Sequence, residues 1–224
     1  MRIFLLILFA PIYAMAAGWK IDAAIKPFYY NHRQSGELAD VTGSALVFNS
    51  YVLSLHKKIN SWQFEVGTHF AKFPFKVKSV SPQSHFYTHY GKVHWKENFL
   101  LVSRNSTPFV ENEDGIKIRQ LTIKWAGYGR NIALWNPHWK GIVSIAFPLS
   151  TNIENYNVKD DSGYQLMAGI RFWQRLKWQK KTWNFNISLF DNYTKLNLKL
   201  DGTGGSNTLT SHQINLAAGL AKQF

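Results

Sequence analysis

The chain contains no cysteine among its 224 residues. This absence excludes a disulfide scaffold, a thiolate metal site and a cysteine nucleophile. Acidic residues are also few, because 13 Asp and Glu stand against 26 Lys and Arg. The formal charge of +13 suggests an acidic partner, either a nucleic acid or an anionic lipid or surface.

Long apolar runs are missing after the first residues. The longest later candidate, residues 142–149, is far shorter than the roughly 18 apolar residues of a transmembrane helix. Met1 is followed by Arg2, an apolar run over residues 3–12, and small residues at Ala14 and Ala16. This order is typical of a secretory signal peptide cleaved after Ala16. We therefore expect a signal peptide over residues 1–16 and a single domain over residues 17–224, exported through the secretory pathway.

Apolar and polar residues alternate along most of the chain. Trp183, Phe185, Ile187 and Leu189, for example, are separated by polar residues. A period of two indicates β-strands with one apolar face. Turn-rich stretches divide these segments, and long polar stretches alternate with short connections. The long stretches cover residues 31–42, 74–84, 105–115, 150–162 and 201–208.

This alternation of long and short connections predicts an all-β fold, a transmembrane antiparallel up-and-down β-barrel of about ten strands. An even strand number places both termini in the periplasm. Eight or twelve strands remain alternatives, because residues 127–140 are long for a turn and residues 131–135 are a candidate further strand. The expected strands cover residues 19–30, 43–56, 62–73, 85–95, 99–104, 116–126, 141–149, 163–175, 182–200 and 209–224.

The ninth expected strand changes its apolar face. Leu189 continues one alternation, whereas Leu196, Leu198 and Leu200 follow the other. A β-bulge near residues 191–193 would explain the change. A strand that rises above the membrane would explain it equally well.

Tryptophan is abundant and falls near the expected periplasmic strand ends. Amphipathic rings prefer the membrane interface, so these residues predict an aromatic girdle. The alternative is a soluble β-sandwich with a tryptophan-rich core. The predicted girdle consists of Trp19, Trp62, Trp95, Trp125, Trp173 and Trp183.

The last strand alternates apolar residues through Leu220 and ends on Phe224, although Lys222 stands where an apolar residue is usual. This strand resembles the terminal strand of bacterial outer-membrane β-barrels. The resemblance implies a location in the bacterial outer membrane, with outer-membrane lipid and lipopolysaccharide as surroundings. It also implies that Leu220 and Phe224 form a signal for the barrel-assembly machinery.

The polar faces of the strands predict a lumen rich in charge. Three functions follow as hypotheses. The first is a barrel with a structural or surface-interaction role, and the second is a narrow pore that prefers anionic or small polar solutes. The third is a membrane-embedded enzyme that hydrolyses lipids or peptides. The predicted lumen residues are Lys20, Asp22, Lys26, Glu65, His69, Lys92, His94, Lys124, Arg171 and Asn186.

Catalytic and metal-binding patterns are weak. None of the eight histidines has a serine two residues later, which is the spacing of barrel lipases. His85 and His89 share a strand face, but a metal site needs three or four ligands. Acidic and histidine residues in the outer loops, as in protease barrels, are equally expected of solvated loop tips. We therefore predict no catalytic residue, no metal and no cofactor.

The positive charge is unevenly distributed over the predicted topology. The five long loops hold four cations and nine anions, so the strands and short turns carry the basic excess. A basic exterior for nucleic acid is therefore not expected. The lumen and the periplasmic mouth are the places where an anionic small solute would bind.

Overall fold

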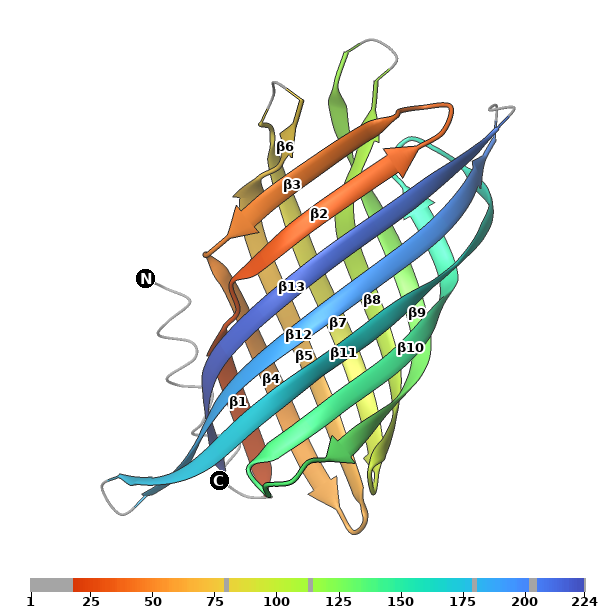
Figure 1. Cartoon of the computed structure of the whole chain (residues 1–224). Coiled ribbons are helices and arrows are strands. Elements are labelled where there is room, and N and C mark those ends of the chain that lie inside the picture. The colour runs from red at the N-terminus through yellow and green to blue at the C-terminus, as the bar shows by residue number, and fades with distance from the viewer. Residues whose placement is uncertain (1–17, 79–80, 113–114, 179–180, 202–204, 224) are drawn as a thin grey trace.

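The computed structural model describes residues 18–223, apart from 79–80, 113–114, 179–180 and 202–204, and shows one tall barrel of tilted strands (Figure 1). The predicted signal peptide lies outside the described residues. No helix in the described residues is long and apolar enough to cross a membrane. The strands are β1 (Trp19–Ile25), β2 (Phe28–Ser35), β3 (Val41–Val47), β4 (Ser50–Ile59), β5 (Trp62–Pro74), β6 (Lys76–Val77), β7 (Gln83–Trp95), β8 (Asn98–Glu111), β9 (Lys117–Ala133), β10 (Trp139–Ile153), β11 (Val158–Trp178), β12 (Lys181–Leu200) and β13 (Ser206–Gln223).

The barrel closes because β1 pairs with both β4 and β13, antiparallel in each case. The ring runs β1-β4-β5-β7-β8-β9-β10-β11-β12-β13 and returns to β1, so the prediction of ten antiparallel strands is confirmed. Three further strands extend the wall at one end. β2 continues the pairing of β1 along β13, β3 pairs with β2, and β6 pairs with β3 (Figure 1).

Residues 127–133 belong to β9, so their interpretation as part of a turn is wrong. Leu100 pairs with Tyr128, and Asn98 pairs with Arg130. Glycines in this stretch made it look like a turn, but Gly129 has a packing role. A Cβ atom there would overlap the ring of Phe99, so glycine lets that ring lie across the strand. Only residues 134–138 separate β9 from β10.

Three of the five stretches predicted as long polar loops, residues 31–42, 105–115 and 150–162, are mostly strand. β8, for example, continues to Glu111, and β11 already begins at Val158. The hydrogen-bonded ladder therefore extends well past the apolar outer wall. Hydrogen bonding does not need an apolar outward face, so a strand that leaves the membrane loses its outer apolar signal but not its partners.

The interior changes from polar to apolar along the barrel. Leu189 points outward and is 46% exposed, whereas Leu196 points inward and is fully buried. The β12–β13 register runs without a shift from Trp183 to Lys199, so the bulge explanation is wrong. The face changes because the loop end of the barrel has an apolar core and a polar exterior. This core includes Phe28, Tyr30, Phe73, Phe75, Val77, Phe109, Leu121, Ile123, Trp125, Leu196, Leu198, Leu200 and Leu209.

The turn end of the barrel has the opposite arrangement. Its outer wall carries exposed apolar side chains, and its lumen is polar. An apolar outer band around a polar interior is the architecture of transmembrane β-barrels. The band includes Leu53, Phe64, Val66, Leu100, Val102, Val143, Ile145, Phe147, Ile170, Ile187, Leu189, Leu216 and Leu220.

The loop end is also stabilised by a charged contact at the tip of the β8–β9 hairpin, outside the apolar band. Arg119 Nε donates a hydrogen bond to Glu111 Oε2 at 2.8 Å. Lys117 Nζ lies 3.6 Å from Glu111 Oε1. The hydrogen bond from Arg119 holds the pKa of Glu111 below its ordinary value of 4.5.

The depressed pKa predicts a pH-dependent effect of Glu111→Gln. The ionised carboxylate stabilises the folded state above the unfolded pKa, and this contribution is lost as the pH falls through the folded pKa. The wild type should therefore exceed the variant in thermal stability at pH ~7 by more than at pH ~3. Melting in detergent micelles at both pH values measures the difference, and a gap that is equal at both would contradict the assignment.

Candidate functional site

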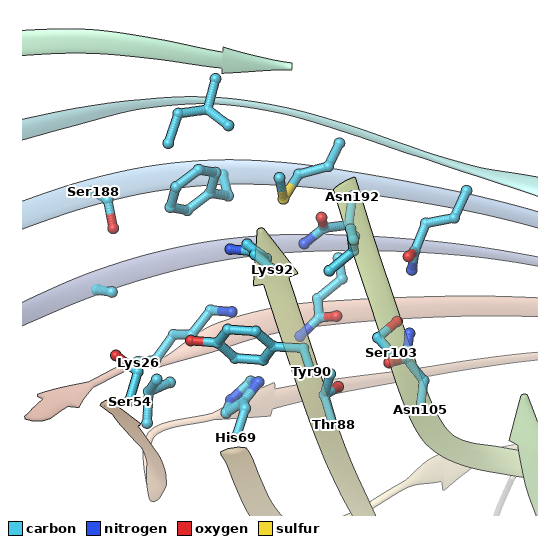
Figure 2. A pocket seen from close by; sticks show the side chains of 18 of the residues that line it. Lys26, Ser54, His69, Thr88, Tyr90, Lys92, Ser103, Asn105, Ser188 and Asn192 are labelled. Carbon is cyan, nitrogen blue, oxygen red and sulfur yellow. The ribbon is translucent and has the colours of Figure 1, made fainter. Parts of the chain in front are cut away.

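A cavity of about 220 Å³ occupies the lumen. Its lining combines polar side chains from the turn half of the barrel with aromatic side chains from the apolar core. Lys26, Tyr90 and Lys92 extend into it (Figure 2). The cavity is therefore a polar chamber that borders the apolar core.

The apolar core closes the loop side of this chamber, and two contacts join opposite walls there. Gln34 Nε2 donates to the carbonyl of Val110 at 2.7 Å, and Val110 N donates to Gln34 Oε1 at 2.9 Å. The hydroxyls of Tyr30 and Thr107 lie 2.6 Å apart. In both cases a β2 side chain meets β8 across the lumen. These contacts and the aromatic rings between them form a seal, which we call the luminal seal.

His32 is part of this seal and is fully buried. Its outward neighbours Asn31 and Arg33 are polar, so it lies beyond the apolar band. Burial lowers the pKa of His32 to about 4, and the ring is neutral near pH 7. The luminal seal therefore carries no net charge from this residue at neutral pH.

Glu65 is the centre of the polar chamber. Its side chain is buried, and three bases surround the carboxylate. Lys92 Nζ lies 3.6 Å from Oε1, while His94 Nε2 and His56 Nδ1 lie 3.3 Å and 3.7 Å from Oε2. A buried carboxylate requires such partners because an isolated charge is strongly unfavourable there.

Two serine–histidine contacts involve histidines that line the chamber, and neither contact was predicted from the sequence. Ser54 Oγ lies 2.9 Å from His56 Nε2, and Ser50 Oγ lies 2.5 Å from His69 Nε2. Ser54 stands two residues before His56, the reverse of the order sought in the sequence, and both orders place the side chains on one strand face.

Ser54, His56 and Glu65 have the order of contacts found in a serine–histidine–acid triad. The geometry is different, because 3.7 Å between His56 Nδ1 and Glu65 is too long for the hydrogen bond that orients a catalytic base. Glu65 is also held by Lys92 and His94. This arrangement is a network of ion pairs that supports the barrel wall.

Two cations of the chamber lack a carboxylate partner. Among the described residues, no acidic side chain lies within ion-pair distance of Lys26 or Arg171. Arg171 Nε is buried without a hydrogen bond, and its guanidinium lies 5.8 Å from the centre of the Phe190 ring. Asp22, the other luminal acid, accepts a hydrogen bond from Asn186 at 3.3 Å and lies 3.9 Å from Lys20 Nζ. The chamber therefore carries a positive excess.

The structure places the predicted lumen residues on the inner face, with the exception of Lys124. Most of them line the chamber, and Lys20 shares the inner face through its pairing with His56. Lys124 points outward and is exposed, whereas Trp125 points inward and is 1% exposed. The predictions of Lys124 as a lumen residue and Trp125 as a girdle residue are both wrong, because this part of β9 lies at the apolar core. The inward side chain must be apolar there, and the charged one faces out.

Trp173 is a second tryptophan that the structure removes from the predicted girdle. It pairs with Asn186, so the two share the inner face of the barrel. The alternation of Leu166, Ala168, Ile170 and Phe172 already puts Trp173 on the opposite, polar face, so a position near a strand end was not enough to place it in the girdle.

The remaining predicted girdle residues point outward at the turn end. The rings of Trp62 and Trp95 stack with centroids 6.1 Å apart. Lys57 Nζ lies 4.9 Å from the Trp19 ring, and Lys222 Nζ lies 5.3 Å from the Trp183 ring. Cation–π contacts of this kind hold a lysine at an interface and explain how Lys222 fits on an apolar wall.

The predicted assembly signal is only partly described. Leu220 points outward and is 47% exposed, on the wall face of the last strand. Phe224 lies outside the described residues. No group of three or more potential metal-ligating side chains occurs among the residues that the structure describes.

Comparisons with known proteins find no matching family model and no matching curated protein. Solved structures with a similar shape exist. The chain matches the outer-membrane protease OmpT of Escherichia coli at 8% identity and a TM-score of 0.45, covering 94% of this chain and 98% of that one. It matches the β-domain of the Bordetella autotransporter BrkA at 11% identity and a TM-score of 0.41, covering 91% and 98%. The outer membrane protein AlkL matches at 12% identity and a TM-score of 0.41, covering 93% and 90%.

The closed antiparallel barrel with an apolar outer band is the architecture of bacterial outer-membrane β-barrels. The resemblance predicted from the C-terminal strand is confirmed at the level of the fold. No subfamily is indicated.

The network around Glu65 predicts a large effect of Glu65→Gln. This substitution keeps the shape of the side chain but leaves Lys92 without its counter-charge, so the free energy of unfolding should fall by about 3 kcal/mol or more. Glu97→Gln is the matched control. Glu97 pairs with Arg130 at 3.0 Å, both side chains are 58% exposed, and its loss should cost less than about 1 kcal/mol. Urea unfolding in lipid vesicles measures both, and equal effects would contradict a central role for Glu65.

Proposed function

We propose that this chain is a bacterial outer-membrane barrel with a closed lumen and a structural or surface-interaction role. The observation that carries the proposal is the luminal seal. A barrel made for solute flow needs a continuous aqueous path, and here the loop half of the lumen is filled by apolar side chains. The barrel therefore acts as a rigid support for the strands that extend beyond the apolar band.

The luminal seal opposes ion flow because an ion would have to lose its water to cross it. The rings of Phe73 and Phe75 have centroids 6.4 Å apart, and the Phe75 ring lies 5.9 Å from that of Tyr30. An ion that crosses this layer would lose its hydration shell without gaining polar partners, which is strongly unfavourable. The seal thus opposes conduction even though the chamber below it is polar.

The extended strands favour a role in surface interaction. At the loop end β13 pairs with β2, β2 with β3 and β3 with β6, so this part of the barrel is a hydrogen-bonded wall rather than a set of separate loops. Its core is made of buried apolar side chains. Such a rigid surface binds a partner at little cost in conformational entropy.

An anion-preferring lumen is the second candidate. The observation that favours it is the pair of chamber cations, Lys26 and Arg171, without a carboxylate partner among the described residues. A small anionic solute in the chamber would balance them. In this case the luminal seal is the barrier that controls access from the loop side.

The proposed location has a direct test. The natural chain expressed in a Gram-negative bacterium should be recovered in the outer-membrane fraction. Unheated samples should migrate differently from boiled samples on a gel, because a closed barrel resists unfolding by detergent. Recovery as a soluble periplasmic protein would overturn the proposal.

Planar-bilayer recording tests the closed lumen. The wild type should show no stable conductance, whereas the double variant Phe73→Ala, Phe75→Ala should open the seal and conduct with a preference for anions. The double variant Phe64→Ala, Phe70→Ala is the matched control, since both rings point outward, 41% and 49% exposed. It should stay closed. Stable conductance of the wild type would refute the closed lumen, and a cation preference of the opened variant would refute the anion-preferring candidate.

A further inference from the structure

Three basic side chains form a row on the outer wall. His89 on β7 pairs with Arg104 on β8, and Arg104 pairs with Lys124 on β9. Paired residues of an antiparallel sheet point to the same face, and all three side chains are exposed. Thr68 precedes the row on β5, and Ser150 follows it on β10. We call these five residues the cationic row.

Arg104 and Lys124 stand directly opposite each other. Directly opposed residues have Cβ atoms about 5 Å apart, and like charges at that separation repel. No carboxylate of the described residues lies within ion-pair distance of either side chain, nor of His89. The structure thus holds two like charges together without a counter-ion among the residues that it describes. An external anion bound between them would remove the repulsion.

Several cations at the turn end of the wall have partners of their own. At the turn end, Arg130 pairs with Glu97 at 3.0 Å. Lys57 lies over the Trp19 ring, and Lys96 Nζ lies 5.1 Å from the Trp95 ring. The cationic row differs from these turn-end cations because it contains several donors and neither an acid nor a tryptophan. Its composition is that of a site for an anion with several oxygen atoms.

The surroundings of the row identify the kind of anion. The next outward row toward the turn end contains Val66, Val102 and Phe147, each more than half exposed. The row after it contains Phe64 and Leu100. A wall that is cationic at one level and apolar below it matches a molecule with a charged head and an apolar tail.

We propose that the cationic row binds the phosphate of a lipid in the loop-side leaflet, with the acyl chains lying over the apolar rows. This inference rests on the proposed membrane location. Arg104 presents a planar fork that suits two phosphate oxygens, and Lys124 adds a point charge that reaches toward the headgroup. His89 and Ser150 lie beside them as further hydrogen-bond donors. The phosphate offsets the repulsion between Arg104 and Lys124, so the lipid also stabilises this part of the wall.

A phosphate-matched lipid pair tests the inference. The probes are lipid A, the phosphorylated anchor of lipopolysaccharide, and the same lipid with its phosphates removed. Native mass spectrometry of the detergent-solubilised barrel measures the bound lipid. The wild type should retain lipid A at least about tenfold better than the dephosphorylated form, and Arg104→Gln, Lys124→Gln should remove this preference. Equal retention of both lipids by the wild type would overturn the proposal.

The control is the double variant Lys96→Gln, Arg130→Gln, which removes two cations from the turn end of the same wall. It should retain lipid A as the wild type does, and loss of binding in this variant would overturn a site at the cationic row. Excess inorganic phosphate is the second arm. It should not displace lipid A, because the acyl chains contribute to binding, and complete displacement would show a site for a free ion instead. All variants should still fractionate with the outer membrane, so failure of lipid binding is distinguishable from failure of the proposed location.

Discussion

Closure of the ring through β1 is the constraint on which the rest of the structure depends. Hydrocarbon offers no hydrogen-bond partners, so a sheet in a membrane can leave no edge unpaired. β1 satisfies this requirement by pairing with β4 on one side and β13 on the other. Once the ring is closed, each strand has one face to the lumen and one to the surroundings. The chemistry of every side chain then depends on whether it points inward or outward and on its height along the barrel.

The preferred direction of apolar side chains reverses between the two halves of the barrel. In the turn half, outward residues such as Leu189 are apolar and inward residues such as Glu65 are charged. In the loop half, Leu196 and Trp125 point inward while Lys124 points outward. The same strand thus follows the rule of a membrane protein at one end and that of a soluble protein at the other. The luminal seal is the consequence, because the apolar residues of the loop half have only the lumen in which to be buried.

The sequence predicted the ten antiparallel strands well because a period of two is a local property that survives the change of environment. It predicted several strand ends poorly, since a turn was placed where the outward apolar signal stopped, near Asn105, although β8 continues to Glu111. The prediction that Trp125 faces outward was wrong because this part of β9 lies beyond the apolar band. Contacts between distant strands, such as Gln34 with Val110, have no local pattern, so the luminal seal was not predictable from the chain.

The charge of the chain shows why topology is needed to interpret composition. Inside the chamber the excess is concentrated on Lys26 and Arg171, where a small anion is the natural complement. Outside, Arg104 and Lys124 are brought together by the register of β8 and β9, although they are far apart in sequence. A pair of like charges at the border of an apolar surface is stable where a counter-ion is always present, and a leaflet of phosphorylated lipid provides one. The proposed lipid site would account for this part of the basic composition.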